Sequence, residues 1–368
     1  MPRVFEPFAL RGLTLRNRLV VSPMCQYSCE ARDGLATDWY LVHLGSRAVG
    51  GAGLVFTEAA AVTPEGRISP EDLGFWSDAH ADALSRAVAF VKSQGAAVGI
   101  QLAHAGRKAS TYRPWERGAG IPDAEGGWTP IAPSAVPHAP DYRLPHALAE
   151  DEIEPLVVRP FTEAAARAHR LGVDALEIHA AHGYLLHEFL SPVANHRTDR
   201  YGGSFTNRVR VVLEVVDAVR DAWPDDKPLS VRLSATDWLP EGWDIDECVQ
   251  LAKLLGEHGV DMIDCSSGGI SPAQQIVLGP GYQVPFAERI RREANVPTAA
   301  VGLITTPEQA EAILAAGQAD LIIMARQFLR DPYFPLYAAQ ALDAPDTVAW
   351  PVQYQRAAPR GAHLAGQR

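Results

Sequence analysis

Eight short apolar runs, rich in valine, isoleucine and leucine, recur along the chain. They cover residues 18–24, 52–62, 96–104, 173–181, 229–235, 260–267, 296–304 and 319–326. Most of them are continuously apolar, without an alternating polar face, which is typical of strands that are buried on both faces of a parallel sheet. The pattern therefore predicts eight parallel strands.

Segments with a helical period separate most of these runs. They cover residues 80–95, 161–172, 207–223, 245–259 and 306–317, and several end in glycine, as helices commonly do. Strands that alternate with helices predict an α/β protein, and eight such units predict a closed (β/α)8 TIM barrel. A barrel with long loops accommodates 368 residues in one domain, which we place at residues 1–357.

Two segments fall outside the repeating pattern. Residues 110–147, after the third strand, are dense in glycine and proline and too long for a simple connection, so we expect a lid over the barrel mouth. Trp115 and Trp128 would either line a pocket or anchor the lid's own packing, and the sequence leaves both open. Residues 358–368 are predicted to be a disordered tail.

Reactive, polar or glycine residues stand where the predicted strands end. Because the active sites of (β/α)8 barrels lie at the carboxyl ends of the strands, these residues should converge. In chain order they are Met24 and Cys25, Glu58 and Ala59, Gln101 and His104, His179 and His182, Arg232, Cys265, Gly302, and Ala325 with Arg326. Packing alone does not explain this set, and we expect an enzyme.

The last two strand ends predict a cofactor that carries a phosphate group. Loops after the seventh and eighth strands of such barrels frequently bind phosphate through backbone N–H groups. Gly302 would let the backbone approach closely, and Arg326 offers a guanidinium whose donors suit a phosphate. The glycine patterns of Rossmann and P-loop proteins are absent from the sequence.

Charge and composition narrow the class of partner. The formal net charge of −11 argues against nucleic acid, whose phosphates are neutralised by clustered lysine and arginine. The apolar runs are too short for a membrane span, and the N-terminal residues lack the pattern of a secretory signal. The four cysteines form no CxxC pair, which fits reduced thiols. We therefore expect a cytoplasmic protein that acts on a small molecule.

Five longer motifs allow a comparison with known families. They are NRLVVSPMCQYS, GIQLAHAGRKA, EIHAAHGYLLHEFLSPVANHRTDRYGGSFTNR, VRLSATD and RQFLRDP. The chain resembles the Old Yellow Enzyme family from about residue 3 to about residue 357, and the cysteine in SPMCQYS and the ending PVQYQRA are similar to its bacterial, thermophilic-like branch. The resemblance implies an FMN-dependent NAD(P)H oxidoreductase, an ene-reductase that reduces activated C=C bonds of α,β-unsaturated carbonyl or related compounds by ping-pong hydride transfer.

The resemblance also implies where FMN binds. The ring would contact Ser22, Pro23, Met24, Cys25, Ala59, Gln101 and Arg232, and the phosphate would contact Gly302, Ala325 and Arg326. A cation at Arg232 would stabilise the anionic reduced flavin. Family members usually have glycine in place of Ala325, and alanine serves a backbone N–H contact as well unless φ there is positive.

His179, His182 and Tyr184 are the catalytic residues that the resemblance implies. The two neutral imidazoles would donate to the carbonyl or nitro oxygen of the substrate, and Tyr184 would protonate its α-carbon. Tyr27 would be a second hydroxyl at the substrate. Cys25 would tune the flavin potential or the fit of the substrate without forming a covalent bond.

The ending of the chain implies an oligomer. Tyr354 and Arg356 resemble a C-terminal segment that reaches into the active site of a neighbouring subunit, so we expect a homodimer or a homotetramer with Arg356 in the partner's pocket. The sequence does not identify the physiological substrate, and it does not decide between NADPH and NADH.

The His-x-x-His spacing alone leaves other readings open. It also occurs in buried structural pairs, and a zinc site would recruit His187 and Glu188, which would make the protein a metal-dependent barrel hydrolase or aldolase. We expect no metal, because these two side chains follow in a helical turn that should point elsewhere.

Neighbouring polar residues have expected structural roles. His104 and Arg107 would either line the mouth or bind adjacent loops. Asp199, Arg200 and Asn207 are expected to fix their own loop without touching the substrate.

Overall fold

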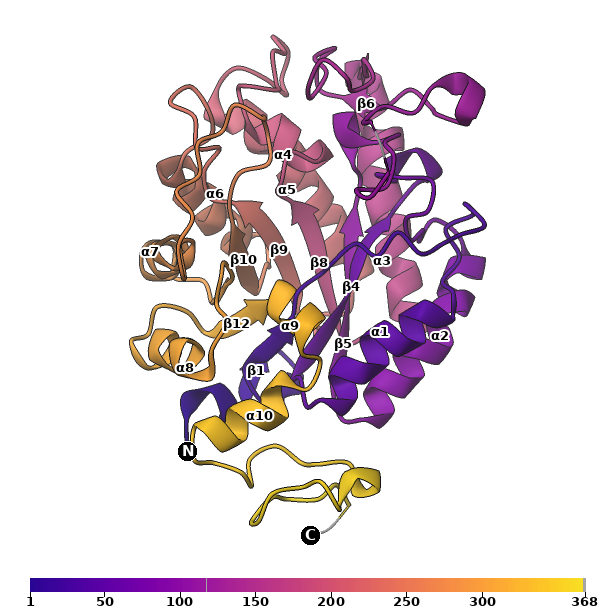
Figure 1. Cartoon of the computed structure of the whole chain (residues 1–368). Helices are drawn as coiled ribbons and strands as arrows, with labels where there is room; N and C mark the ends of the chain where they lie inside the picture. The colour runs from indigo at the N-terminus through magenta and orange to yellow at the C-terminus, as the bar shows by residue number, and fades with distance from the viewer. Residues whose placement is uncertain (117, 367–368) are drawn as a thin grey trace.

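The computed structural model describes residues 1–116 and 118–366, and its central feature is a closed barrel of eight parallel strands (Figure 1). The strands are β3 Leu19–Val21, β4 Leu54–Ala61, β5 Ala97–Ala103, β8 Ala175–Ala180, β9 Leu229–Ser234, β10 Met262–Ser266, β11 Thr298–Ala300 and β12 Leu321–Met324. They follow chain order around the barrel, and β12 closes it by pairing with β3. Each predicted run contains one strand, so the (β/α)8 prediction is confirmed.

Helices surround the barrel. They are α1 Asp38–Val49, α2 Asp78–Ser93, α3 Arg159–Leu171, α4 Leu185–Leu190, α5 Phe205–Ala222, α6 Ile245–Glu257, α7 Val284–Ala294, α8 Pro307–Ala315, α9 Arg326–Arg330 and α10 Phe334–Ala341. The predicted helical segments correspond to α2, α3, α5, α6 and α8. Within the part of the chain that the structure describes, no helix has the length and apolar content needed to cross a membrane.

The barrel strands are buried along their length. Every residue of β4, β8, β9 and β10 is buried, although several of them are polar. Helices cover the outer face of the barrel, and side chains from neighbouring strands fill its interior. Burying an aliphatic side chain such as Ile178 stabilises the folded protein by about 1.5–3 kcal/mol. Buried polar side chains bring no such gain, so the polar residues of these strands have a role other than core packing.

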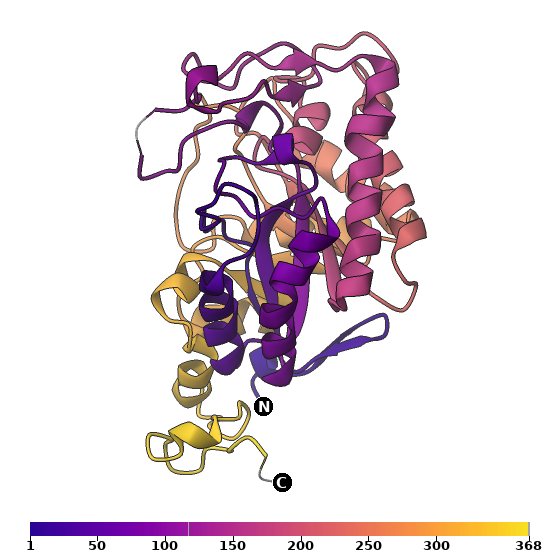
Figure 2. The ribbon, with the colours of Figure 1, turned by 90° about the vertical axis from the view of Figure 1, so that its right-hand side faces the viewer.

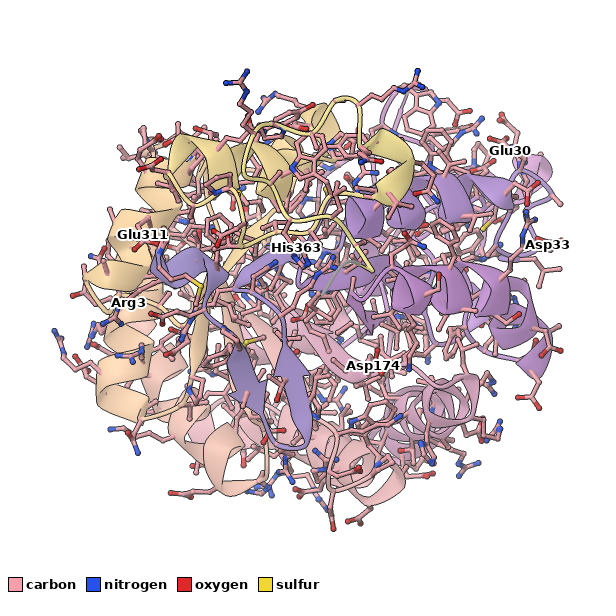
Figure 3. All side chains as sticks on the ribbon, turned by 90° about the horizontal axis from the view of Figure 1, so that it is seen from below. Arg3, Glu30, Asp33, Asp174, Glu311 and His363 are labelled. Atoms are coloured by element: carbon pink, nitrogen blue, oxygen red, sulfur yellow. The ribbon has the colours of Figure 1, made fainter. Side chains whose placement is uncertain are left out.

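The amino-terminal segment closes the lower end of the barrel. β1 Phe8–Leu10 and β2 Leu13–Leu15 form an antiparallel hairpin that the sequence pattern does not predict. Glu311 of α8 accepts hydrogen bonds from the N–H groups of Arg3 and Val4, at 3.0 Å each, and Figure 3 shows Arg3 and Glu311 side by side at this end. The carboxyl ends of the strands are left for a functional site.

A long excursion after β5 lies at the opposite end, at the top of Figures 1 and 2. Its elements are η3 Gly106–Lys108, η4 Asp123–Glu125, β6 Ile131–Ala132, β7 His146–Ala147, η5 Glu150–Glu152 and the π-helix η6 Glu154–Val158. β6 and β7 pair in parallel. The lid-like excursion predicted after the third barrel strand is present.

The C-terminal residues fold back beneath α10. The N–H of Trp350 donates to the carbonyl of His363 (2.8 Å), the N–H of Ala365 donates to the carbonyl of Trp350 (2.8 Å), and Leu364 is buried. Within the tail predicted to be disordered, residues 358–366 are described, and Leu364 is the buried residue beside these backbone contacts. Residues 367–368 of the expected tail lie outside the described residues.

Candidate active site

One side of the barrel mouth is a row of neighbours on β4, β5 and β8. Ala59 pairs with Gln101, and Gln101 pairs with Glu177. Gln101 Nε2 donates to Glu177 Oε1 (2.8 Å), and Ser230 Oγ donates to Oε2 (3.1 Å). Burial, followed by the charge of Asp264, raises the pKa of Glu177 to about 8. Because its amide N–H is directed to Glu177, Gln101 keeps its Oε1 for a ligand donor.

Arg232 occupies the next position around the mouth. It pairs with His179 on β8 and with Asp264 on β10. Its Nε lies 3.2 Å from Asp264 Oδ2, and its Nη1 donates to Ser22 Oγ (3.1 Å). Burial raises the pKa of Asp264, although Arg232 opposes that effect. A guanidinium is thus fixed in a poorly hydrated site, where its field is stronger than in water.

A cavity of about 150 Å³ opens between the ends of β11 and β12. Gly302, Ala325 and Arg326 all line it, together with the guanidinium-bearing Arg330. Gly302 has φ +122°, and a Cβ there would lie 3.0 Å from Gln283 Nε2, so this position requires glycine. Ala325 has φ −101°, and a negative φ does not require glycine at this position.

His179 on β8, His182 on the turn that follows and Tyr184 at the N-terminus of α4 lie together. The rings of His179 and His182 are 5.1 Å apart, and those of His179 and Tyr184 are 5.0 Å apart, both in edge-to-face contact. His182 Nε2 lies 2.6 Å from Ser266 Oγ at the end of β10. The structure thus brings together the three residues predicted to be catalytic.

The protonation states of this group follow from its contacts. His179 Nδ1 accepts from the N–H of Ala181 (3.3 Å), so its proton sits on Nε2 and is available to a ligand. Burial, followed by the charge of Arg232, lowers the pKa of both His179 and His182 well below 6.5. Burial raises the pKa of Tyr184 well above 10.0. At neutral pH the group is two neutral imidazoles and a phenol.

The end of β3 contributes Cys25 and Tyr27. Tyr27 has φ +51°, an uncommon conformation for an aromatic residue that often marks a functional site. Cys25 is half-buried, and burial together with the charges of Asp72 and Glu58 raises the pKa of its thiol. A thiol with a raised pKa is a poor nucleophile, which agrees with the non-covalent role expected for Cys25.

The two lid tryptophans have different surroundings. Trp115 lies edge-on to Tyr27, with ring centres 5.7 Å apart, and is 64% exposed. Trp128 donates through Nε1 to the carbonyl of Glu65 (2.8 Å) and stacks with Arg67, whose guanidinium carbon is 5.3 Å from the ring centre. Trp115 is therefore the wall candidate, whereas Trp128 anchors the lid.

Lys108 belongs to the site and was not singled out in the sequence. Its Nζ donates to the carbonyls of His182 (3.0 Å) and Gly269 (3.3 Å) and lies 5.1 Å above the ring centre of Tyr184. Burial lowers its pKa to about 8. The signal available was its place in the motif GIQLAHAGRKA, four residues after the strand-end residue His104.

His104 and Arg107 bind neighbouring loops. His104 Nδ1 accepts from the N–H of Gly106 (3.1 Å), and burial lowers its pKa to about 3. Arg107 donates to the carbonyls of Ile270 (2.6 Å) and Val136 (3.3 Å). Of the two readings left open by the sequence, these contacts favour the structural one.

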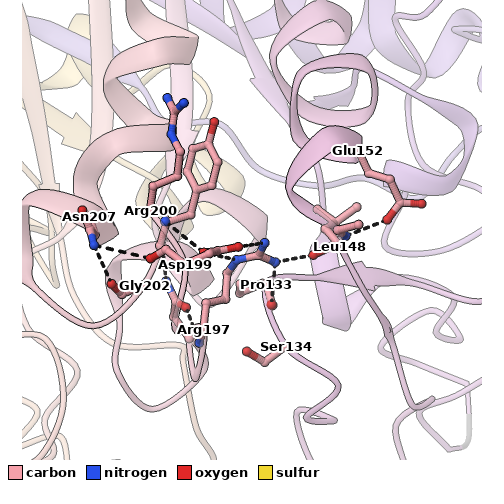
Figure 4. Close-up of polar contacts among 12 residues, drawn as sticks. Pro133, Ser134, Leu148, Glu152, Arg197, Asp199, Arg200, Gly202 and Asn207 are labelled. Carbon is pink, nitrogen blue, oxygen red and sulfur yellow. Dashed lines mark hydrogen bonds and ion pairs between the residues drawn. The ribbon is translucent and has the colours of Figure 1, made fainter.

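The long motif after α4 ties the lid to the barrel (Figure 4). Arg197 pairs with Asp199 and donates to the carbonyls of Pro133 (3.1 Å) and Leu148. Asn207 Nδ2 lies 3.4 Å from the carbonyl oxygen of Asp199. These side chains hold loops together, as expected for Asp199 and Asn207.

The additional ligands that a zinc site would need are engaged elsewhere. His187 Nε2 lies 2.9 Å from Asp237 Oδ1, and Glu188 Oε1 accepts from the N–H of Arg107 (2.8 Å). Across residues 1–116 and 118–366, no group of three or more His, Cys, Asp and Glu side chains is placed to hold a metal ion.

Tyr354 and Arg356 do not join the site of their own barrel. They lie in the C-terminal segment, drawn in yellow at the end of the molecule opposite the lid in Figures 1 and 2. Tyr354 is 41% exposed, and its hydroxyl lies 3.3 Å from that of Tyr333.

A barrel mouth that combines an anion cavity, a fixed guanidinium and neutral hydrogen-bond donors defines an enzyme that binds a phosphate-bearing cofactor beside its substrate. Two solved structures of similar shape are named as reductases. The chain is 28% identical to morphinone reductase in complex with tetrahydroNAD, with a TM-score of 0.77 over 94% of this chain and 92% of that chain. It is 25% identical to a 2-naphthoyl-CoA reductase (TM-score 0.83), of which it spans about half, 53%, while 94% of this chain is covered.

Sequence comparison identifies the family. The model of the NADH:flavin oxidoreductase / NADH oxidase family matches residues 3–344. An NADPH dehydrogenase of Geobacillus sp. (strain WCH70) is 50% identical over 353 residues, which cover 96% of this chain and 98% of the relative. The chain belongs to the NADH:flavin oxidoreductase / NADH oxidase family, which confirms the resemblance to Old Yellow Enzyme. It is a flavin-dependent oxidoreductase with FMN as cofactor and NAD(P)H as hydride donor.

The residues present fit FMN. The cavity between β11 and β12 combines two arginines with the glycine backbone of Gly302, which suits a phosphate. At the barrel axis, Gln101 offers an acceptor and Arg232 offers donors and a positive charge, which suit the N–H and carbonyl groups of an isoalloxazine edge.

Proposed function

We propose that this enzyme is an ene-reductase, which reduces activated C=C bonds of α,β-unsaturated carbonyl or related compounds in a ping-pong cycle. The observation that carries this proposal is the cluster of His179, His182 and Tyr184 at the carboxyl end of β8, which offers neutral imidazoles and an un-ionised phenol at one place. Such an alkene needs donors at its oxygen and a proton at its α-carbon, and this cluster supplies both.

We propose that FMN lies across the mouth. Its ring would be held by Ser22, Pro23, Met24, Cys25, Ala59, Gln101 and Arg232, and its phosphate by Gly302, Ala325 and Arg326. Bound there, FMN would supply hydride transfer between NAD(P)H and the second substrate. The relatives named NADPH dehydrogenase and the morphinone reductase in complex with tetrahydroNAD support a nicotinamide donor.

His179 and His182 are proposed to hold the substrate oxygen. His179 donates through Nε2, because its Nδ1 accepts from the Ala181 N–H. His182 has its Nε2 beside the Ser266 hydroxyl, which can donate to it and leave Nδ1–H for the substrate. Both hydrogen bonds strengthen as the oxygen gains enolate charge, so they favour the transition state over the ground state.

Tyr184 is proposed to protonate the α-carbon. Its raised pKa keeps the phenol protonated between turnovers, and the Lys108 ammonium 5.1 Å above its ring stabilises the negative charge that forms as the proton leaves. Tyr27, in the segment that follows β3, is proposed as a second hydroxyl contact to the substrate.

A homo-oligomer is proposed in which Tyr354 and Arg356 complete the pocket of a neighbouring subunit. The support is that both lie in an exposed segment far from the mouth of their own barrel. A dimer and a tetramer both allow this arrangement.

An anaerobic visible spectrum, recorded before and after NADPH and again after 2-cyclohexenone, tests the proposed function. Flavin absorbance should bleach with NADPH and return with the alkene. Bleaching without recovery on any activated alkene would refute the substrate class and leave the family assignment intact.

Two variants then assign the roles. Tyr184→Phe should slow the recovery step about 10²–10⁴-fold, as expected for loss of a general acid. His179→Ala should raise KM for the alkene and lower kcat as well, because a grip on the developing enolate is lost. Equal alkene reduction by both variants and the native enzyme would contradict the assignment.

A further inference from the structure

Behind the catalytic turn lies a buried pair that the proposed mechanism does not use. His187 of α4 and Asp237, which follows β9, are both fully buried, and His187 Nε2 lies 2.9 Å from Asp237 Oδ1. His187 Nδ1 accepts a hydrogen bond from the N–H of Gly183 (2.9 Å). The pair therefore connects the core of the barrel to the residue between His182 and Tyr184.

The contacts define the state of this pair. Because Nδ1 of His187 accepts, its proton sits on Nε2, which lies 2.9 Å from Oδ1 of the Asp237 carboxylate. Asp237 Oδ2 also accepts from Ser191 Oγ (2.6 Å) and from the N–H of Trp243 (2.7 Å). Burial raises the pKa of Asp237, but His187 and these two donors outweigh it and lower the pKa below its ordinary value. Asp237 is thus an ionised acceptor.

The turn that the pair contacts has a strained backbone. His182 has φ +60° and Gly183 has φ +74°, and a Cβ on Gly183 would lie 2.2 Å from the carbonyl oxygen of Gly269. A left-handed histidine persists only where its surroundings hold it. The N–H of His182 donates to Ser234 Oγ (2.9 Å) and Lys108 binds its carbonyl, so the Gly183 N–H is the next point at which the turn is held.

We propose that Asp237 and His187 form a positioning pair for the reaction. Asp237 fixes the tautomer of His187, and His187 Nδ1 holds the Gly183 N–H, so that His182 and Tyr184 face one substrate molecule together. This rests on the proposed function, in which His182 holds the oxygen and Tyr184 delivers the proton. Neither member of the pair touches the substrate.

Two matched variants separate positioning from packing. His187→Asn keeps an acceptor where Nδ1 lies, whereas His187→Leu fills a similar volume without one. The chemically reduced holoenzyme of each is mixed with 2-cyclohexenone and, separately, with oxygen, whose reduction needs neither His182 nor Tyr184. His187→Leu should slow reoxidation by the alkene about tenfold to a hundredfold, the loss typical of a small misplacement, with the oxygen rate unchanged. His187→Asn should stay within about threefold of the native rate.

Several results would overturn the positioning role. They are an unchanged alkene rate in His187→Leu, equal losses in both variants, or a parallel loss of the oxygen rate. A ¹⁵N spectrum of the histidines in the native holoenzyme decides even if a variant does not fold: a proton on Nδ1 of His187 would refute the role. Failure of every activated alkene to reoxidise the native enzyme would refute the proposed function, while the histidine spectrum would still report on the pair.

Discussion

The guanidinium of Arg232 is paired inside the barrel with the carboxylate of Asp264, at 3.2 Å and with both side chains buried. The pair sets how much positive charge the barrel mouth offers to a flavin. A buried charge with a partial counter-charge is a means of adjusting a redox potential without changing the cofactor.

Asp264→Asn should therefore make the midpoint potential of the bound flavin more positive. Loss of the carboxylate leaves Arg232 less compensated, which favours the anionic reduced form. We expect a shift on the order of 30 mV, equivalent to about 1.4 kcal/mol for two electrons. Potentiometric titration measures the midpoint potential, and Asp221→Asn, at an exposed position of α5, is the matched control. An unchanged potential would show that Asp264 already carries a proton in the native enzyme.

Substitution of Gly302 should weaken FMN binding, whereas substitution of Ala325 should not. Gly302→Ala places a side chain at φ +122° and should weaken FMN binding by about tenfold to a hundredfold, from strain of about 1–3 kcal/mol. Ala325→Gly should leave the affinity within about threefold, because φ there is −101°. Calorimetric titration of the apoprotein with FMN compares them. A gain in affinity for Ala325→Gly would mean that the bound site needs a positive φ.

The rate of alkene reduction should not fall as the pH drops through 6.5, the ordinary pKa of histidine. Burial lowers the pKa of His179 and His182 well below 6.5, so both imidazoles stay neutral as pH falls through 6.5. We expect kcat/KM for 2-cyclohexenone to be constant from neutral pH down to about 5.5. A decline with a midpoint near 6.5, in protein shown by its melting temperature to be folded, would contradict this.

Substitution of the two lid tryptophans should have different effects, on substrate binding for Trp115 and on protein stability for Trp128. Trp115→Ala removes the ring beside Tyr27 and should change KM for bulky alkenes several-fold without lowering the melting temperature. Trp128→Ala removes a hydrogen bond and a cation–π contact and should lower the free energy of unfolding by about 1–2 kcal/mol. Thermal unfolding and steady-state kinetics on both variants test this difference. The reverse result would make Trp128 the wall residue and Trp115 the anchor.

The strands were predictable because a strand buried on both faces needs only a local apolar run. Helix α7 was not, because only Val284, Ala287 and Ile290 of its residues are buried and arginine and glutamate fill most of the other positions. In α1, exposed Trp39 and Val42 obscure the helical period.

In the site, the residues at the strand ends were predictable from the sequence, whereas long-range contacts and tautomers were not. The convergence of Gln101, His179 and Arg232 follows from the barrel, since each lies on a strand. Lys108 depends on carbonyls 74 and 161 residues away, at His182 and Gly269, and no local pattern announces such contacts. The tautomer of His179 likewise needs the folded turn around Ala181.

The contacts that hold the lid to the barrel bear on how enzymes of this kind change their substrate range. Arg197 donates to the carbonyls of Pro133 and Leu148, and Trp128 Nε1 donates to the carbonyl of Glu65, so the lid is fastened to the barrel at separate points. Chain length between fixed ends costs little conformational entropy, since each doubling adds only about 0.6 kcal/mol. The stretch between the fastenings can therefore be exchanged like a cassette, and new substrate ranges can evolve or be engineered there while the barrel and its chemistry remain intact.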